Sequence, residues 1–338
     1  MDNTRLALLL ALGGCVIVFL SILVSTDQPE KADLEILKKY GLIELEDTSV
    51  EHRSYSYTLF IDGEWIIKKT LIIDEAPAVV FLAGSEVRIA EGASLLIKAS
   101  VFIQGKDSMP VRIRSMNSEF PFGVFAVLGK GSGECRISGL DLSGGSADTL
   151  DGSIFSGALS IRNSTVSIEN SNIHDNFGED GMHIVDSTVE ISHCTFSNNR
   201  SDQLDLDNAE GSVFNCRFEN ERGNANGDGL DLSKCNLRVE RSSFTGMKDK
   251  GLSAGEKSKV QVKNCKFEVN DLALAAKDFS EVHVSNSTFD KNRIVFVAYQ
   301  KKKKYGGALI FEMNNKVGSG QQFDSTDATS KVVRSQTP

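Results

Sequence analysis

Aspartates in the stretch GNANGDGLDLSKC, residues 223–235, offer the most distinctive chemistry in this sequence. Asp228 and Asp231 stand in that stretch, and three further aspartates shortly precede it: Asp202, Asp205 and Asp207. Carboxylate oxygens suit Ca²⁺, which accepts about six to eight oxygen ligands in flexible geometry. The stretch lacks the ligand spacing and terminal glutamate of an EF-hand loop. A cation site here would therefore have to be assembled from neighbouring repeats.

The charge of the chain is concentrated in the same region. The 338 residues carry a net charge of −9, and the segment from Glu179 to Asp231 holds twelve acidic and three basic residues. The remainder is neutral overall. The net charge of −9 argues against a nucleic-acid partner, because phosphate-binding proteins present a basic field. A hydrophobic content of 40% supports a sizeable core.

A repeat of about 22 residues organises most of the chain. Two apolar columns recur with this period. The first column is Leu159, Met182, Leu204, Leu230, Leu252 and Leu274, and the second is Ile173, Phe196, Phe218, Phe244, Phe267 and Phe289. Successive members lie 22 or 23 residues apart, except for one spacing of 26 where ERGNANG lengthens a turn. Because so short a unit cannot bury its apolar face alone, neighbouring units must stack and share one core.

Short segments of alternating apolar residues fill each repeat, such as VSI at 166–168 and VHV at 282–284. Alternation with a period of two predicts strands with one buried face. The repeats show neither a helical apolar pattern nor the spacing of leucine-rich repeats. The sequence therefore predicts an all-β fold, a right-handed parallel β-helix solenoid with about 22 residues per coil, behind an N-terminal transmembrane helix.

The corners of the predicted coils also repeat. Three residues before each member of the second column, four of the six residues are asparagine, which tolerates left-handed backbone geometry. The next position is always small: Ser171, Cys194, Cys216, Ser242, Cys265 and Ser287. We expect Cys194 and Cys216 to stack as buried free thiols, with a disulfide as the less favoured alternative. The cysteine spacings match no zinc site.

The run Leu6–Val24 is uncharged and apolar over about the length that spans a bilayer as a helix. A cleaved signal peptide and a lipoprotein signal at Cys15 are alternatives, but an uncleaved anchor accounts for the whole run. Arg5 precedes the run and acidic residues follow it, which predicts a single-pass protein with its bulk outside the cytoplasm. The expected divisions are an anchor at 6–24, a stalk at 25–55, the β-helix at 56–312 and a disordered polar tail at 313–338.

Residues 56–312 resemble the pectate-lyase-like superfamily of right-handed β-helices. The stretches DKGLSAGEKSKV, AAKDFSEV and AYQKKKKYGGA are similar to β-helix modules that accompany CotH-like kinase domains in bacterial surface proteins. The resemblance covers about three-quarters of the chain and implies a bacterial membrane protein whose β-helix faces outside. It implies no established reaction.

Two acidic columns follow from aligning the coils, and both are expected to face solvent. The column two residues before the first apolar column is Asp180, Asp202, Asp228 and Lys250. The column one residue after it is His183, Asp205, Asp231, Ser253 and Ala275. With Asp207, these aspartates should form one patch, and their repulsion should raise their pKa values or attract a cation. His183 is expected as a surface histidine in the same row.

GDGLDLS is similar to the aspartate-rich motif of a calcium-dependent pectate lyase family, in which aspartates hold the ion and a lysine is the base. The resemblance implies ion-binding roles for Asp228 and Asp231. The lysine does not carry over, because Ser253 occupies the matching position and Lys250 stands in the other column. The candidate metal ligands are Asp202, Asp205, Asp228 and Asp231, and Lys250 is the weak candidate for catalysis. Calcium is the candidate cofactor.

Three functions remain open at this point. The first is a non-catalytic module that binds or scaffolds an envelope polysaccharide, with His183, Asp202, Asp205, Asp207, Asp228 and Asp231 as the ligand-binding residues. The second is a calcium-dependent polysaccharide lyase, and the third is a purely structural ectodomain beside an envelope protein. The run Lys301–Lys304 is expected as a solvated loop, with contact to anionic lipids or polymers as the alternative.

Overall fold

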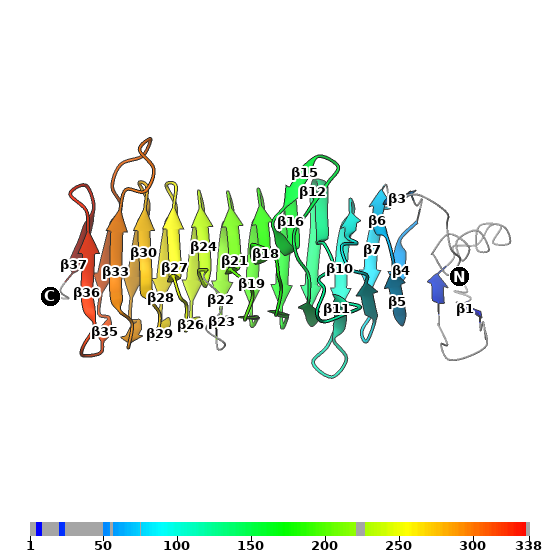
Figure 1. The fold of residues 1–338 in the computed structure, drawn as a ribbon, viewed down its shortest axis with the longest axis horizontal. Helices are drawn as coiled ribbons and strands as arrows, with labels where there is room; N and C mark the ends of the chain where they lie inside the picture. Colours follow the sequence, from blue (N-terminus) through cyan, green and yellow to red (C-terminus); the bar gives the residue numbers. More distant parts are fainter. Residues whose placement is uncertain are drawn as a thin grey trace.

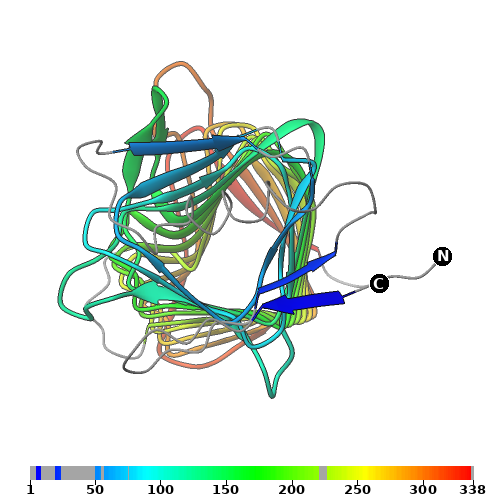
Figure 2. The same cartoon turned by 90° about the vertical axis from the view of Figure 1, so that its right-hand side faces the viewer.

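The computed structural model describes residues 5–8, 20–23, 50–54, 57–74, 76–220 and 227–335. Within these ranges the chain winds into a parallel β-helix, in which the coils contribute strands to three parallel sheets. Figure 1 shows the coils stacked along one axis, and Figure 2 looks along that axis. The all-β solenoid predicted from the repeat is confirmed.

The first sheet carries the candidate site. Its strands are β3 (Val50–Ser54), β6 (Thr70–Asp74), β9 (Leu95–Ile97), the first parts of β12 (Phe125–Ser138) and β16 (Gly157–Glu169), β18 (Asp180–Val185), β21 (Asp202–Asp207), β24 (Leu230–Ser233), β27 (Lys250–Gly255), β30 (Leu272–Lys277), β33 (Ile294–Tyr299) and β36 (Gln322–Thr326).

The second sheet follows after one corner. Its strands are β4 (Leu59–Ile61), β7 (Ala78–Phe81), β10 (Ser100–Gln104), the later parts of β12 and β16, β19 (Thr188–Ser192), β22 (Glu210–Phe214), β25 (Asn236–Glu240), β28 (Lys259–Lys263), β31 (Glu281–Ser285), β34 (Leu309–Met313) and β37 (Lys331–Ser335).

The third sheet closes each coil. Its strands are β5 (Glu64–Ile67), β8 (Glu86–Ile89), β11 (Val111–Ser115), β13 (Leu140–Ser143), β17 (Asn172–His174), β20 (Thr195–Ser197), β23 (Arg217–Glu219), β26 (Ser243–Thr245), β29 (Lys266–Glu268), β32 (Thr288–Asp290) and β35 (Lys316–Val317). A separate antiparallel hairpin joins β14 (Asp148–Leu150) to β15 (Ser153–Phe155).

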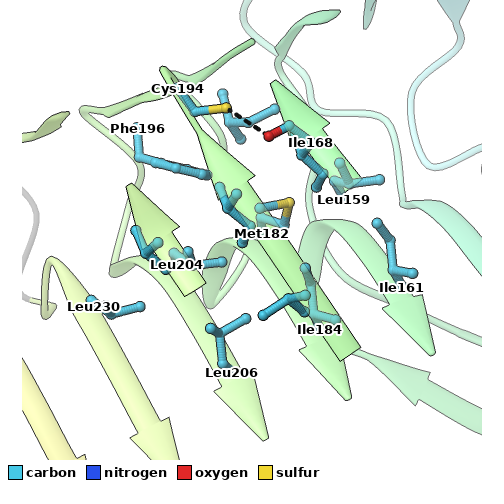
Figure 3. Packing of buried hydrophobic residues seen from close by; sticks show 14 of the residues in the cluster. Leu159, Ile161, Ile168, Met182, Ile184, Cys194, Phe196, Leu204, Leu206 and Leu230 are labelled. Carbon is cyan, nitrogen blue, oxygen red and sulfur yellow. Dashed lines mark hydrogen bonds between the residues drawn. The ribbon is translucent and has the colours of Figure 1, made fainter. Parts of the chain in front are cut away.

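Both predicted apolar columns lie inside the solenoid, as Figure 3 shows for several of their members. Leu159, Met182 and Leu204 pair in register on successive strands of the first sheet and are fully buried. On the third sheet the rings from Phe196 to Phe289 stack with centroids 4.7 to 5.1 Å apart. One ring per coil at the strand spacing makes this column a continuous aromatic stack.

The corner predictions are confirmed in the same coils. All six corner residues have φ between 50° and 56°: Asn170, His193, Asn215, Arg241, Asn264 and Asn286. The described cysteines are buried free thiols, so the disulfide alternative is not realised. Cys194 Sγ, for example, points at the carbonyl oxygen of Ile168 in the preceding coil, 3.8 Å away (Figure 3). Small side chains at this position let the chain turn tightly without opening the core.

The predicted N-terminal divisions lie largely outside the described residues. Of the predicted anchor 6–24, the described residues form β1 (Arg5–Leu8) and β2 (Leu20–Leu23), an antiparallel pair, and the rest lies outside the described residues. Across the described ranges we find no helix long and apolar enough to cross a membrane. Residues 25–49 of the predicted stalk also lie outside them, whereas β3 places the end of the stalk in the β-helix.

The tail predicted as disordered forms a further coil. β35, β36 and β37 pair in parallel with β32, β33 and β34, so residues 316–335 extend the solenoid beyond residue 312. The polar composition misled the prediction because the preceding coil supplies backbone hydrogen-bond partners whatever the side chains are. Phe323 and Val332 add the apolar contacts to the core. Residues 336–338 lie outside the described residues.

Candidate functional site

The row of side chains directly after the first apolar column alternates with buried leucines and faces away from the core. Register places His183, Asp205, Asp231 and Ser253 side by side on β18, β21, β24 and β27. Because neighbouring strands lie about 4.8 Å apart, Asp205 and Asp231 are adjacent carboxylates. The prediction that they share one face is confirmed.

The other predicted column does not face solvent. Asp180, Asp228 and Lys250 expose only 2%, 3% and 6% of their surfaces, and Asp202 is half-buried. These residues stand where the strand alternation is interrupted, because the next residue faces the core: an added Cβ at Gly229 would lie 3.0 Å from the buried Phe244 ring. Asp228 itself brings a carboxylate oxygen within 4.8 Å of Asp231 in the outward row. The column therefore lies at the corner where each coil enters the first sheet, and its residues satisfy their polar atoms within the protein.

Hydrogen bonds link these corner residues from coil to coil. Asp202 Oδ1 accepts a bond from the Asp228 amide at 2.6 Å. Asp228 Oδ1 accepts bonds from the Lys250 amide at 2.9 Å and from Lys250 Nζ at 3.0 Å. Lys250 Nζ also pairs with the Asp249 carboxylate. Lys250, the weak candidate for catalysis, is thus a buried counter-ion held by two carboxylates.

A second lysine reaches the cluster from farther along the axis. Lys277 Nζ lies 3.4 Å from Asp231 Oδ1, and the side chain is buried. It passes over Gly255, where an added Cβ would come within 3.2 Å of Lys277 Cε. A glycine at this position therefore leaves the path open between the two charged groups.

His183 connects the buried and exposed carboxylates. Ser156 Oγ lies 2.7 Å from His183 Nδ1 and donates a 2.7 Å hydrogen bond to Asp180 Oδ2. On the other side of the ring, Nε2 faces Asp207 Oδ2 at 3.3 Å and Asp205 Oδ2 at 3.7 Å. The His183 side chain is only 10% exposed, which corrects the expected surface histidine. It is held between four polar side chains.

Burial raises the pKa of four cluster aspartates above the ordinary value of 3.8. The pKa rises to about 6 for Asp180 and Asp228, to about 8 for Asp202 and to about 10 for Asp205. After burial, the nearest carboxylates raise the pKa of Asp202 and Asp205 further, whereas Lys250 opposes the rise at Asp228. Burial disfavours the charge of Lys250, but Asp228 and Asp249 outweigh it and raise the lysine pKa. Such shifts concentrated in one place are typical of functional sites.

Two groups of side chains bring ligand atoms within 4.8 Å of one another. One is Asp202, Asp228 and Asp231, and the other is Asp180, His183 and Asp205. The first is an all-oxygen set, which suits Ca²⁺. Ser253 Oγ, fully buried on the strand beside Asp231, has no hydrogen-bond partner among the described residues. A buried polar atom left without a partner on the strand beside Asp231 fits a group that the protein itself does not supply.

The structure thus brings most of the predicted site residues together: His183, Asp202, Asp205, Asp228, Asp231 and Lys250. Asp207 lies at the rim, with 42% of its side chain exposed. Sequence reasoning missed Ser156, which lies ahead of the tidy repeats, and Lys277, which belongs to a coil two repeats beyond Asp231. Lys277 could have been found from the repeat, because it stands in the same column of successive coils as Asp207 and Gly255.

A groove of about 530 Å³ runs beside the cluster, along the corner between the first and second sheets. Its floor repeats from coil to coil through Asn163, Asp186, Asn208 and Lys234. Asn208 directly follows Asp207, so the groove adjoins the rim of the cluster, but none of the clustered carboxylates lines it. The groove extends along the solenoid axis, because its lining residues come from successive coils.

Residues 126–317, more than half of the chain, match the family described as "Right handed beta helix region". The chain belongs to this family, which agrees with the right-handed β-helix predicted from the repeat. No curated protein matches the sequence.

Solved structures share the fold at low sequence identity. A mutant of the periplasmic alginate epimerase AlgG superposes with a TM-score of 0.61 and 10% identity over 85% of each chain. Unmutated AlgG gives a TM-score of 0.58 and 11% identity over 86% of this chain and 85% of its own. An alginate lyase from Paenibacillus sp. str. FPU-7 gives 0.38 and 16% over 74% of this chain and 93% of its own. At these identities the likeness to the two AlgG structures establishes the fold alone.

Proposed function

We propose that this protein binds an acidic, uronate-containing polysaccharide at the aspartate cluster, through a divalent cation held by Asp202, Asp228 and Asp231. The observation that carries the proposal is this oxygen triad beside the buried, partnerless Ser253 Oγ. A bound Ca²⁺ would supply positive charge and free coordination positions for a carboxylate of the polymer. The fold shared with the alginate epimerase AlgG supports a polysaccharide as the ligand class.

The charge balance of the cluster favours a cation. Five buried or half-buried aspartates, Asp180, Asp202, Asp205, Asp228 and Asp231, face two lysines, Lys250 and Lys277. An anionic polymer would be repelled by the remaining negative charge unless protons or a cation neutralised it. Oxygen ligands without sulfur point to a hard cation.

The predicted context belongs to the same proposal. We infer a bacterial envelope polysaccharide as the polymer, a membrane anchor at Leu6–Val24 and a β-helix that faces outside the cytoplasm. The similarity of AYQKKKKYGGA and its companion stretches to modules beside CotH-like kinase domains supports a surface location. If the protein failed to bind polysaccharide, this result would favour a purely structural ectodomain.

Elimination at a uronate is the second candidate function, and Lys277 is the observation that favours it. Its amine is buried beside the oxygen triad and has one carboxylate partner among the described residues, whereas Lys250 is held by two. In this reaction a base takes the C5 proton, the C4–O4 bond breaks, a C4=C5 double bond forms, and a proton goes to the leaving oxygen. Ultraviolet-absorbing unsaturated products from uronate polymers, lost in Lys277→Met, would establish the activity.

Thermal unfolding with and without calcium tests the proposed cation site. A ligand that binds only the folded state stabilises it by about 2.7 kcal/mol at a hundredfold excess over Kd. We expect calcium to raise the Tm of the wild type and to leave unchanged the Tm of the double variant Asp228→Asn with Asp231→Asn. Glu190→Gln with Glu210→Gln removes two exposed carboxylates of the second sheet and should keep the calcium response. An equal response in both double variants would refute the site.

A further inference from the structure

We propose that Phe279 and Tyr305, with the lysines around them, form an anionic-sugar subsite beside the aspartate cluster. The proposal deepens the function proposed above and rests on it: the subsite would bind another unit of the same uronate polymer. It assigns a role to Lys301–Lys304, the only four-lysine run in a sequence whose net charge is −9.

Phe279 is an exposed aromatic side chain held in an unusual backbone conformation. The residue exposes 55% of its surface. Its φ is 64°, a left-handed value that disfavours bulky residues. The Phe279 amide donates to the Gly306 carbonyl at 3.2 Å, and an added Cβ at Gly306 would lie 2.2 Å from the Phe279 ring. The preceding coil makes the same left-handed turn with Lys257 at a φ of 71°, so the turn fixes this backbone conformation. What distinguishes Phe279 is a large apolar ring kept in solvent, a feature typical of contact surfaces.

Tyr305 completes an aromatic corner with Phe279. The two rings meet edge to face, with centroids 6.3 Å apart and an interplanar angle of 86°. Tyr305 Oη donates to Glu256 Oε2 at 3.1 Å, which fixes the ring at its polar end. Pyranose rings present an apolar C–H face that packs on aromatic rings, and two perpendicular rings define a corner for one sugar.

Two exposed lysines, Lys257 and Lys304, lie over the Tyr305 ring, and the same loop carries two more exposed lysines, Lys301 and Lys303. Lys304 Nζ lies 5.0 Å and Lys257 Nζ 5.9 Å from the centre of the Tyr305 ring. Within the described part of the chain no carboxylate forms a salt bridge with any of these four, whereas Lys302 pairs with Glu256. Their charges are therefore free to meet the carboxylates of an acidic sugar chain.

The loop that carries these lysines is ordered by a buried carboxylate. Asp278 is 1% exposed, and its Oδ1 accepts bonds from the amides of Lys301 and Lys302, both at 2.7 Å. Figure 1 shows the loop projecting beyond the tip of β33. A presented aromatic and a pre-ordered basic loop lower the entropy lost when a ligand binds.

The subsite is continuous with the aspartate cluster along the backbone. Lys277, whose amine contacts Asp231, is followed directly by Asp278 and Phe279. The cation site lies where coils enter the first sheet and Phe279 lies just after β30 leaves it, so a polymer that crosses this sheet along Lys277 would meet the aromatic corner. The aspartate cluster is negatively charged, whereas the lysines at the aromatic corner are positively charged. The corner therefore attracts an anionic polymer directly and needs no cation.

Calorimetric titration with an oligogalacturonate tests the subsite. In the presence of EDTA, the wild type should retain weak binding, and Phe279→Ala should weaken it about tenfold. Lys303→Ala with Lys304→Ala should weaken it about as much and reduce its dependence on salt. The matched controls are Val269→Ala, another exposed apolar residue with a φ of 61°, and Lys259→Ala with Lys263→Ala on the second sheet. Both controls should bind like the wild type.

The outcomes separate this inference from the cation site. If Phe279→Ala and the double lysine variant bind like the wild type while the aspartate variants lose calcium-dependent binding, the subsite is wrong and the cation site stands. If binding is calcium-independent and lost only in Phe279→Ala, the subsite stands and the cation site falls. Tighter binding to vesicles of phosphatidylglycerol than to the oligosaccharide would assign the loop to a membrane surface and overturn the subsite.

Discussion

Lys277 Nζ lies 3.4 Å from Asp231 Oδ1, although two coils separate the residues along the axis. The side chain crosses Gly255, the intervening residue in its column. In this position Lys277 supplies a positive charge to the oxygen triad from within the protein. A cation bound at Asp202, Asp228 and Asp231 would compete with that charge.

Removing the Lys277 charge should therefore tighten calcium binding. We expect Lys277→Gln to lower the Kd for Ca²⁺ roughly tenfold, because a unit charge a few ångströms away opposes a divalent cation strongly. Titration calorimetry with calcium measures the change. Lys259→Gln, which removes an exposed lysine from the second sheet, should leave the Kd unaltered. Weaker calcium binding in Lys277→Gln would mean that the lysine supports the site instead of competing with a cation.

Asp205→Asn should stabilise the calcium-free protein. Burial raises the folded-state pKa of Asp205 to about 10, from 3.8, so the folded state holds a proton that the unfolded state releases. Because its pKa is raised on folding, Asp205 contributes stability when the pH is below its unfolded-state pKa. This contribution is lost as the pH rises toward its folded-state pKa. The stability of the variant relative to wild type should therefore grow between about pH 5 and pH 8, by at most about 1.4 kcal/mol per pH unit.

Urea unfolding in EDTA at several pH values provides the measurement for Asp205. Glu210→Gln, at an exposed carboxylate of the second sheet, is the control and should show no such growth. A difference between Asp205→Asn and wild type that stays constant or shrinks with pH would contradict the proton assigned to Asp205.

The aromatic stack should dominate the stability of the central coils. Phe244 lies between Phe218 and Phe267 at centroid distances of 4.7 Å on both sides and is fully buried. Phe244→Ala should cost about 3–5 kcal/mol, because it removes a buried ring and leaves a cavity that stacked strands cannot close. Phe244→Leu should cost clearly less. An alanine variant within about 1 kcal/mol of wild type in chemical unfolding would show that the solenoid collapses into the space.

His174 should make part of the stability depend on pH near neutrality. Its Nε2 lies 2.9 Å from Asp141 Oδ1 and its Nδ1 2.9 Å from Asp175 Oδ2. The bond to Asp141 raises the pKa of His174 above 6.5, although burial opposes the rise. The resulting stabilisation is complete below about pH 6.5 and is lost as the pH rises through the folded-state pKa.

His174→Gln tests this pH dependence. The variant should be less stable than wild type at about pH 5.5, and the gap should narrow toward about pH 9. His283→Gln, at an exposed histidine of the second sheet, provides the comparison. A gap that widens with pH would show that neutral His174 is the form stabilised by folding.

Repetition made most of the fold predictable. Phenylalanine at every 22 to 26 residues and asparagine at the corners indicate one arrangement, coils stacked in register. The last coil escaped prediction because it follows no column and is polar, yet backbone pairing with β33 and β34 is sufficient to order it. Backbone bonding is the same for every residue type, so composition alone does not reveal it.

The site was predictable only where its residues share the repeat. Asp205 and Asp231 follow from alternation, and both lie where alternation places them. Asp180 and Asp228 were expected in solvent, but they are buried beside the outward row, because the alternation is interrupted at the glycine that follows each of them. Ser156 and Lys277 reach the cluster through side-chain length and an open corner, which no spacing rule captures.

The most direct test of the central claim is calorimetric titration of the whole protein with an oligogalacturonate in calcium and in EDTA. We predict that calcium tightens binding to the wild type at least about tenfold, and that Asp228→Asn with Asp231→Asn abolishes this difference. The same affinity in calcium and in EDTA for the wild type would contradict a cation-mediated polysaccharide site at the aspartate cluster.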